Sequence, residues 1–326
     1  MRIAVLSGGI GGARFLSGLR AAVNEKDTSI SVVGNTADDI WLFGLRICPD
    51  LDTVMYTLGG GIDEERGWGR RDETWNAKAE LAAYGVQPTW FGLGDRDVAT
   101  HLVRTQMLNA GYPLSAVTEA LCARWQPGVR LLPMTDDRVE THVVIDDPAA
   151  EGTRRAVHFQ EYWVRMRAPA AHGVVAIGAE KSTPGPGVTD VISDADVLIF
   201  APSNPVVSIG TILAVPGIAE AVRTTSAVVV GVSPIIKGAP VHGMADKLLP
   251  VLDVEVSARG VAEHYGSRRD GGLLDGWLID EADAADLPAL SALGLAAGAV
   301  PLYLSDRAAS AAMAGETLAL AERASG

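Results

Sequence analysis

The chain has 326 residues, of which 48% are hydrophobic and 21% are charged, and its formal net charge is −13. This composition is typical of a globular protein with one large α/β domain and an inserted subdomain, or with two domains. The negative charge argues against a nucleic-acid binder, which needs a basic face. Two distant cysteines, Cys48 and Cys122, indicate neither a disulfide framework nor a zinc site, so we expect a cytoplasmic protein. The N-terminus enters an apolar strand at once and the apolar stretch 287–304 contains proline and glycine, so we expect neither a signal peptide nor a membrane span.

The first predicted strand runs directly into a glycine-rich turn. Residues 2–6 read as a buried parallel strand, Gly8, Gly9, Gly11 and Gly12 follow, and apolar residues at helical spacing come next. At such a turn the first helical N–H groups are unpaired and the helix dipole is positive, which suits a diphosphate. Arg14 stands where the dinucleotide pattern has its third glycine, and no Gly-Lys-Ser/Thr follows, so neither standard fingerprint is present. The motif favours a nucleotide-like ligand; a turn that serves only close helix–strand packing is the alternative.

Strand-like runs alternate with helix-like runs along the chain. This alternation favours an α/β fold with a Rossmann-like, mostly parallel sheet and helices on both faces. The predicted strands cover residues 2–6, 30–34, 173–177, 197–200, 227–232 and 277–279. In such a sheet the loops after the strands gather at one edge and form the ligand crevice. We therefore expect the special residues of these loops to lie together.

A mainly helical section interrupts the alternation between about residues 50 and 169. We predict helices over 50–58, from a cap at Asp72 through residue 81, and over 98–109, and a hairpin that pairs 138–145 with 155–159. We interpret the chain as a single α/β domain, residues 1–326, in which this inserted subdomain roofs the crevice.

Two adjacent acids follow the second predicted strand. The strand ends at Asn35, and Asp38 and Asp39 come next. Mg²⁺ typically takes one or two carboxylates together with phosphate oxygens and water. Beside a phosphate-binding turn, this pair predicts a magnesium site. In the alternative interpretation one acid caps the next turn and the other is solvated.

A second pair of acids, Asp50 and Asp52, opens the first helix of the insertion. Because they are two residues apart, they do not share one face of a helix. Asp50 directly follows a proline and is the better cap, so we predict that Asp52 enters the crevice. Capping by both acids is the alternative.

Two further loops carry candidate ligand-binding groups. Gly92 opens a Gly-Leu-Gly-Asp-Arg-Asp stretch, which either covers an anionic group or is a self-paired surface turn. Ser203, Asn204 and Ser208 follow an apolar strand at the position of the expected crevice and offer hydroxyl, amide and helix-start donors. We predict that this second loop binds ligand.

The chain lacks several catalytic patterns. It has no serine nucleophile elbow, no catalytic-cysteine setting and no His-Glu-x-x-His helix. Backbone donors, carboxylates suited to a metal ion and a few cations remain. These groups are typical of phosphoryl transfer by positioning and charge neutralisation.

Six segments of the chain, taken in order, resemble one known family. They are residues 8–16, 37–41, 48–53, 67–69, 93–101 and 201–205, and they extend over most of the sequence. The family is that of CofD and its actinobacterial form FbiA, transferases that attach a phosphate-linked three-carbon acid to a 5-deazaflavin in coenzyme F-420 biosynthesis. Residues 14–16 and 72–75 are similar to the actinobacterial branch.

The resemblance implies a reaction and its substrates. A guanosine diphosphate ester of enolpyruvate or lactate donates its phospho-acid to the ribityl hydroxyl of the deazaflavin Fo (7,8-didemethyl-8-hydroxy-5-deazariboflavin). GMP leaves, (dehydro) coenzyme F-420-0 forms, and Mg²⁺ assists. The family also suggests a homodimer with small-molecule substrates as partners.

The resemblance also assigns residues. It implies that Asp38 and Asp39 ligate the metal ion and that Asp52 and Gly92 contact the deazaflavin. Asp39 and Asp52 are the catalytic candidates, and Asp52 either accepts the hydroxyl proton or joins Asp38 and Asp39 as a metal ligand. Archaeal members have a basic side chain at the position of Gly92, so a contact there has to come from the backbone.

The guanosine diphosphate part of the donor is assigned to two loops and one strand end. These groups are the glycine turn, Asn35 and the loop with Ser203, Asn204 and Ser208.

Two other functions are weighed against this one. A related glycine-loop family, similar to YvcK, binds nucleotide sugars and is regulatory, so such a chain is a sensor without turnover. The segment 48–53 and Trp68 match the transferases instead. A nicotinamide-dependent oxidoreductase is disfavoured by Arg14 in the glycine turn and by Asn35 at the strand end.

Overall fold

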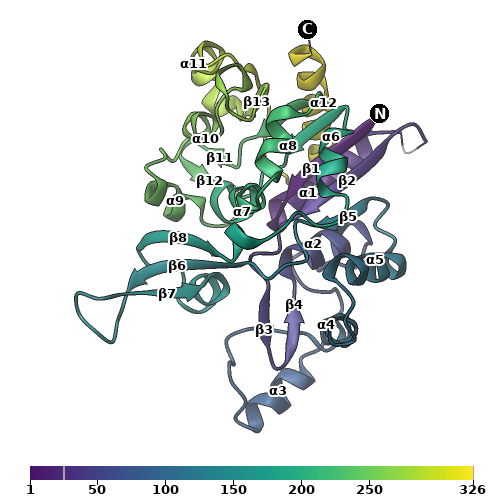
Figure 1. Ribbon diagram of the computed structural model, residues 1–326, viewed down its shortest axis with the longest axis vertical. Helices are drawn as coiled ribbons and strands as arrows, with labels where there is room; N and C mark the ends of the chain where they lie inside the picture. Colours follow the sequence, from purple (N-terminus) through teal and green to yellow (C-terminus); the bar gives the residue numbers. More distant parts are fainter. Residues whose placement is uncertain (25, 326) are drawn as a thin grey trace.

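A seven-stranded sheet forms the centre of the computed structural model, which describes residues 1–24 and 26–325 (Figure 1). Its strand order is β14-β13-β10-β9-β1-β2-β5, and every neighbouring pair is parallel. The strands are β1 (Arg2–Ser7), β2 (Ser29–Gly34), β5 (Arg130–Pro133), β9 (Val197–Phe200), β10 (Val228–Val232), β13 (Gly276–Ile279) and β14 (Ala296–Ala299). The predicted α/β fold with a parallel sheet is confirmed.

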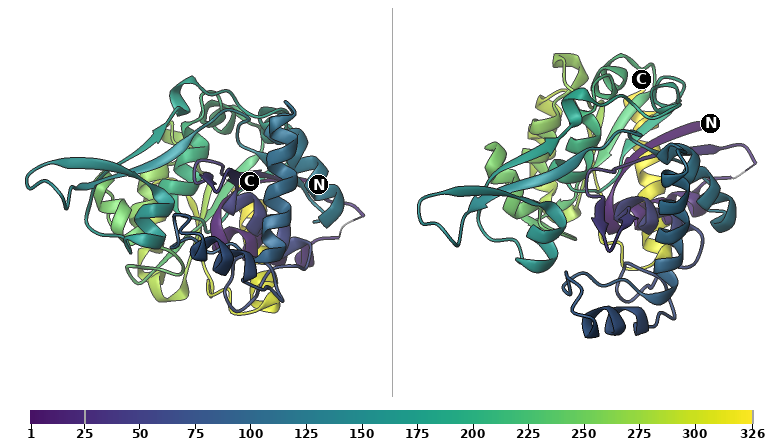
Figure 2. Two further views of the ribbon diagram at one scale, coloured as in Figure 1. Left: turned by 90° about the horizontal axis from the view of Figure 1, so that it is seen from below. Right: turned by 60° about the horizontal axis from the view of Figure 1, so that its bottom comes forward.

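Helices cover both faces of this sheet (Figure 2). One face carries α1 (Gly9–Ala22), α2 (Pro49–Leu58), α5 (Leu114–Trp125) and α12 (Arg307–Ala324). The other carries α6 (Val188–Ser193), α7 (Gly210–Ala214), α8 (Ile218–Thr224), α9 (Ala245–Leu248), α10 (Ala258–Tyr265) and α11 (Leu287–Ala292). Successive residues of β1 alternate between the two cores, with Val5 in one and Leu6 in the other. The faces of the sheet are therefore filled, and its strand ends are left for a ligand.

Two smaller units lie away from the end of the molecule that carries both termini (Figure 1). The first is an antiparallel sheet of β6 (Glu140–Asp146), β7 (Arg154–His158) and β8 (Ala171–Ile177), with the π-helix η1 (Glu161–Arg165) between β7 and β8. The second contains the hairpin β3 (Ile40–Leu42) and β4 (Leu45–Ile47) with α3 (Asn76–Ala83) and α4 (Asp95–Asn109). Short elements complete the chain: η2 (Ala179–Lys181), η3 (Pro205–Ile209), β11 (Ile235–Ile236), β12 (Ala239–Pro240), η4 (Leu249–Leu252), η5 (Arg268–Asp270) and η6 (Glu281–Asp286).

The predicted inserted section differs from the structure in its strands. The hairpin is confirmed as β6 and β7, but the strand predicted over 173–177 pairs antiparallel with β6 and does not join the central sheet. Several of its residues are exposed, as expected when one sheet face meets solvent. Conversely, β5 lies inside the section predicted as an insertion and yet pairs with β2 at the edge of the central sheet. The sequence analysis also missed β14, which consists of alanine and glycine alone.

The predicted helices are present, but the cap predicted at Asp72 is wrong. α2 and α4 match the helices expected over 50–58 and 98–109, although α4 begins already at Asp95. Asp72 does not cap α3, which begins at Asn76. The carboxylate of Asp95 accepts hydrogen bonds from the N–H groups of Asn76 (3.0 Å) and Ala77 (2.8 Å) instead. The cap thus comes from a residue distant in the sequence, which local spacing does not reveal.

None of the single helices within the described residues has the length and apolar composition needed to cross a membrane. One pair, Pro205–Ala214 with Ile218–Thr224, meets that criterion only when its two halves are joined across an 88° bend.

The contact between α1 and α12 provides a test of the fold. A Cβ added at Gly18 would lie 2.2 Å from the carbonyl carbon of Ser310. We expect Gly18→Ala to push the two helices apart and to lower the free energy of unfolding by about 1–3 kcal/mol, measured by urea denaturation. Gly315→Ala is the matched control, because a Cβ at Gly315 meets nothing within 4 Å. This control should be about 1 kcal/mol more stable than the wild type, and equal stabilities of the two variants would contradict the close contact.

Candidate active site

A pocket of about 480 Å³ opens where β1, β2 and β9 end. The first turn of α1, the start of α2 and the loop after β9 line it, together with η1 and the segments 68–69, 91–93 and 242–244. Both smaller units thus contribute wall residues. The structure places the pocket at the sheet edge where a parallel sheet predicts a ligand crevice.

The glycine turn presents the open end of α1 to this pocket. Gly8, Gly9 and Gly11 line the pocket, and the Gly9 backbone donates a hydrogen bond to the Asp50 carboxylate. A Cβ at Gly8 would lie 2.5 Å from Asp50 Oδ2, and one at Gly11 would lie 2.6 Å from the carbonyl oxygen of Pro202. The absence of side chains therefore lets neighbouring loops approach a helix N-terminus that is suited to an anion.

Gly12 has a different role from the other glycines of the turn. It is not among the pocket-lining residues, and a Cβ there would lie 2.2 Å from Ser7 Oγ and 2.6 Å from Ser203 Oγ. For Gly12 the structure supports the packing interpretation.

The loop after β9 is joined to the glycine turn by a pair of hydrogen bonds. The hydroxyl of Ser203 donates to the carbonyl oxygen of Gly8 (2.7 Å) and accepts from its N–H group (3.1 Å). The side chain of Asn204 caps η3, accepting from the N–H of Val206 at 2.9 Å. Ser203, Asn204 and Ser208 all line the pocket, so the two loops predicted to bind donor phosphates lie side by side.

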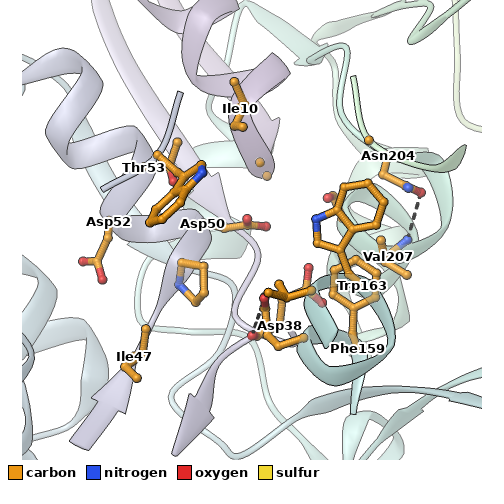
Figure 3. A pocket seen from close by; sticks show the side chains of 18 of the residues that line it. Ile10, Asp38, Ile47, Asp50, Asp52, Thr53, Phe159, Trp163, Asn204 and Val207 are labelled. Atoms are coloured by element: carbon orange, nitrogen blue, oxygen red, sulfur yellow. Dashed lines mark hydrogen bonds between the residues drawn. The ribbon is translucent and has the colours of Figure 1, made fainter. Parts of the chain in front are cut away.

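Asn35 lies beneath the pocket and does not line it. This fully buried amide donates to Asp50 Oδ2 at 3.0 Å and to the carbonyl oxygen of Val207 at 3.1 Å. Asp50 is consequently not the predicted helix cap: α2 begins at Pro49, and the Asp50 side chain turns back toward the glycine turn (Figure 3). Asn35 supports the site through Asp50.

Asp38 and Asp50 lie together near the middle of the pocket (Figure 3). Burial and then the negative charge of Asp50 raise the pKa of Asp38 well above its usual value. Burial raises the pKa of Asp50 to about 6, although hydrogen bonds from Asn35 and the Gly9 backbone act in the opposite direction. Asp38 Oδ1 has no hydrogen-bond partner. Two mutually repelling carboxylates beside an anion site fit a divalent cation that is also bound by phosphate oxygens.

Asp39 lies outside the pocket lining. Its Oδ2 accepts from Arg46 Nη2 at 3.0 Å, and both side chains are buried. Burial raises the pKa of Asp39 to about 6, even though the charge of Arg46 lowers it. The structure therefore does not bring Asp39 together with Asp38 and Asp52 as the predicted metal ligands. Over residues 1–24 and 26–325, no group of three or more His, Cys, Asp or Glu gathers as a metal site.

Asp52 also lines the pocket, but its carboxylate is directed away from Asp50 (Figure 3). Its Oδ1 accepts from Arg104 Nη2, and Arg104 Nη1 lies 3.0 Å from His101 Nδ1. His101 Nδ1 also lies 3.7 Å from Asp52 Oδ2, so the imidazole ring and the guanidinium both approach this carboxylate. Nε2 lies 3.4 Å from Asp97 Oδ2, and Asp97 Oδ1 accepts from the Tyr56 hydroxyl at 2.6 Å. Asp52 is therefore fixed by a buried ionic network.

The outer walls of the pocket are aromatic. Gly92 lines the pocket as predicted, next to Phe91. Trp68, Phe159 and Trp163 are also in the lining, and the sequence analysis missed the last two. They come from a segment that carries no glycine or acidic motif, so no local pattern identified them.

The Asp50 carboxyl gives a prediction for the pH dependence of stability. Its pKa rises on folding from an ordinary 3.8 to about 6, so the buried negative charge destabilises the metal-free fold above pH 6 and has no effect below pH 4. We expect Asp50→Asn to raise the free energy of unfolding at pH 7 by about 2–3 kcal/mol. Urea denaturation in EDTA across this pH range measures the effect. Added Mg²⁺ should stabilise the wild type more than the variant, and a pH-independent difference would contradict the assignment.

The pair of Arg104 and Asp52 gives a second prediction. Arg104→Met leaves the buried Asp52 carboxylate without its counter-ion, so we expect the free energy of unfolding to fall by about 3–5 kcal/mol. Arg2→Met is the control, because Arg2 and Asp196 form an exposed pair, and its loss should cost less than about 1 kcal/mol. Similar losses in both variants would show that the buried network does not hold Asp52.

Comparisons with known proteins identify the family of this chain. Residues 3–293 match the family profile described as 2-phospho-L-lactate transferase CofD. The chain is 65% identical over 323 residues to a phosphoenolpyruvate transferase of Streptomyces coelicolor, covering 99% of this chain and 98% of that protein. It is 62% identical over 328 residues to a phosphoenolpyruvate transferase of Thermobifida fusca, covering 98% of each.

A crystal structure of a UPF0052 family member from Bacillus halodurans has the same fold. Its TM-score is 0.64 at 17% identity, over 97% of this chain and 98% of that one. From the family profile and the close relatives together, the chain belongs to the CofD family of transferases, as its six motif segments predicted.

Proposed function

We propose that the protein transfers a phosphoenolpyruvyl group from a guanosine diphosphate ester to the ribityl hydroxyl of the deazaflavin Fo and releases GMP. One observation carries this proposal: the N-terminus of α1, whose glycines line the pocket, lies beside the two buried carboxylates Asp38 and Asp50. An anion site and a cation site in contact are what a metal-bound diphosphate requires. The names of the close relatives favour the enolpyruvyl over the lactyl donor.

In this proposal the donor diphosphate lies at the turn of Gly8, Gly9 and Gly11 and at the loop of Ser203 and Asn204. Asp38 and Asp50 hold Mg²⁺, and the unpartnered Oδ1 of Asp38 is a free acceptor for it. The ion, when bound, neutralises charge on the phosphate oxygens. The protein positions the donor through backbone groups and needs no covalent intermediate.

The acceptor occupies the other end of the pocket, near Asp52 and Gly92. Arg104 already neutralises one oxygen of Asp52, so we assign this carboxylate to the acceptor hydroxyl and not to the metal ion. Its Oδ2 has no hydrogen-bond partner. The hydroxyl oxygen attacks the phosphorus that carries the three-carbon acid, the bond from that phosphorus to GMP breaks, and the carboxylate accepts the hydroxyl proton.

A transfer assay tests the proposal. Purified protein is mixed with Fo, Mg²⁺ and either the enolpyruvyl or the lactyl guanosine diphosphate ester, and GMP and the deazaflavin product are followed by mass spectrometry. We expect both products with the enolpyruvyl donor. Binding of nucleotide without release of GMP would contradict the proposal and favour a YvcK-like sensor.

The metal assignment gives a further prediction. Asp38→Asn removes one proposed ligand, so we expect the transfer rate to fall at least about 100-fold, as the loss of several kcal/mol of charge stabilisation implies. Asp196→Asn, at an exposed ion pair with Arg2, is the control and should keep the wild-type rate. Equal transfer rates in the wild type and both variants would show that Asp38 does not hold the metal ion.

The family resemblance also leads us to propose a homodimer located in the cytoplasm. Light scattering of the purified protein measures the oligomeric state directly.

A further inference from the structure

Trp163 is a large aromatic side chain left open on the pocket wall. It is 41% exposed, as is the adjacent Val164, and both line the pocket. Apolar side chains of this size are normally covered, and an indole beside a hollow offers a face on which a flat ring is buried. The wall formed by Trp163 and Phe159 therefore offers a surface for a planar partner.

The segment that carries Trp163 is held firmly. Just before η1, the side-chain amide of Gln160 donates to the carbonyl oxygen of Asp38 at 3.2 Å. The backbone N–H of Gln160 donates to His158 Nδ1 at 3.1 Å. Within η1, Tyr162 is fully buried, and its hydroxyl donates to the carbonyl oxygen of Pro169 at 2.8 Å. Single π-helical turns occur frequently at functional sites. The indole is thus presented on a fixed support, which lowers the entropy lost when a ring stacks on it.

The position of Trp163 in the pocket indicates which ring it meets. Figure 3 shows Trp163 on the side of Asn204 and Val207, whereas Asp52 and Ile47 lie on the opposite side. Donor phosphates at the loop of Asn204 place the rest of the nucleotide on that side. An acceptor at Asp52 lies at the other end.

We propose that Trp163 is the stacking platform for the purine base of the donor nucleotide. This inference rests on the proposed function for the identity of the donor, and it adds a residue that fixes the base. Stacking of a base on an aromatic side chain typically changes affinity by about 5- to 150-fold.

Calorimetric titration with GDP tests the platform. We expect Trp163→Ala to weaken GDP binding by about 5- to 150-fold and Trp163→Phe to weaken it less, because phenylalanine keeps an aromatic face. Trp41→Ala is the matched control, because Trp41 is also 41% exposed but does not line the pocket, and it should bind GDP like the wild type. Titration of Trp163→Ala with Fo should give the wild-type affinity. Circular dichroism and thermal melting confirm that each variant is folded.

The outcomes separate this inference from the proposed function. Wild-type GDP affinity in Trp163→Ala, or loss of Fo affinity with GDP affinity retained, overturns the platform alone. Tight GDP binding that depends on Trp163 in a protein without transfer activity supports the platform and overturns the proposed reaction. A wild-type protein that does not bind GDP overturns both.

Discussion

The site depends on one buried amide, Asn35 at the end of β2. Its Nδ2 group donates to Asp50 on α2 and to the carbonyl oxygen of Val207 on η3, while its Oδ1 accepts from the Ala37 N–H group and the Thr211 hydroxyl. A single side chain therefore joins the end of a central strand to a helix start, a π-helix and its own following loop. Because each of these groups is buried, losing the amide would leave several polar atoms unpaired at once. The position of Asp50 beside the glycine turn follows from this arrangement.

The buried acids around the pocket fall into two classes. Asp39 and Asp52 each have an arginine of their own, Arg46 and Arg104, within the protein. Asp38 and Asp50 have none, and burial raises the pKa of both. The fold thus supplies a counter-ion to Asp39 and Asp52 and leaves the two acids at the centre without one. This difference is the reason for assigning the proposed cation to Asp38 and Asp50 and the proton-accepting role to Asp52.

Sequence reasoning found the central architecture because the strands of a buried parallel sheet are short apolar runs and their loops meet at one edge. It placed Gly8, Ser203 and Asp38 in one pocket for that reason, and the structure agrees. It did not predict which of the acids are paired with an arginine and which are not. Which carboxylate faces an arginine depends on tertiary structure: Arg104 on α4 is 52 residues from Asp52, and Arg46, seven residues from Asp39, is returned to it by the β3–β4 hairpin. The spacing of the acids alone does not reveal either contact. The same applies to Trp163, whose exposure is known only once η1 is placed against the pocket.

Gly8 has a consequence for how such a chain changes over generations. A side chain there would collide with a carboxylate oxygen of Asp50 and with the β-carbon and hydroxyl of Ser208, and Ser203 holds both backbone groups of Gly8. No single replacement at Gly8 relieves these contacts, because the obstacles belong to α2 and η3. A lineage that replaced the glycine would have to change both elements as well. The contacts of its neighbours therefore restrict this position to glycine.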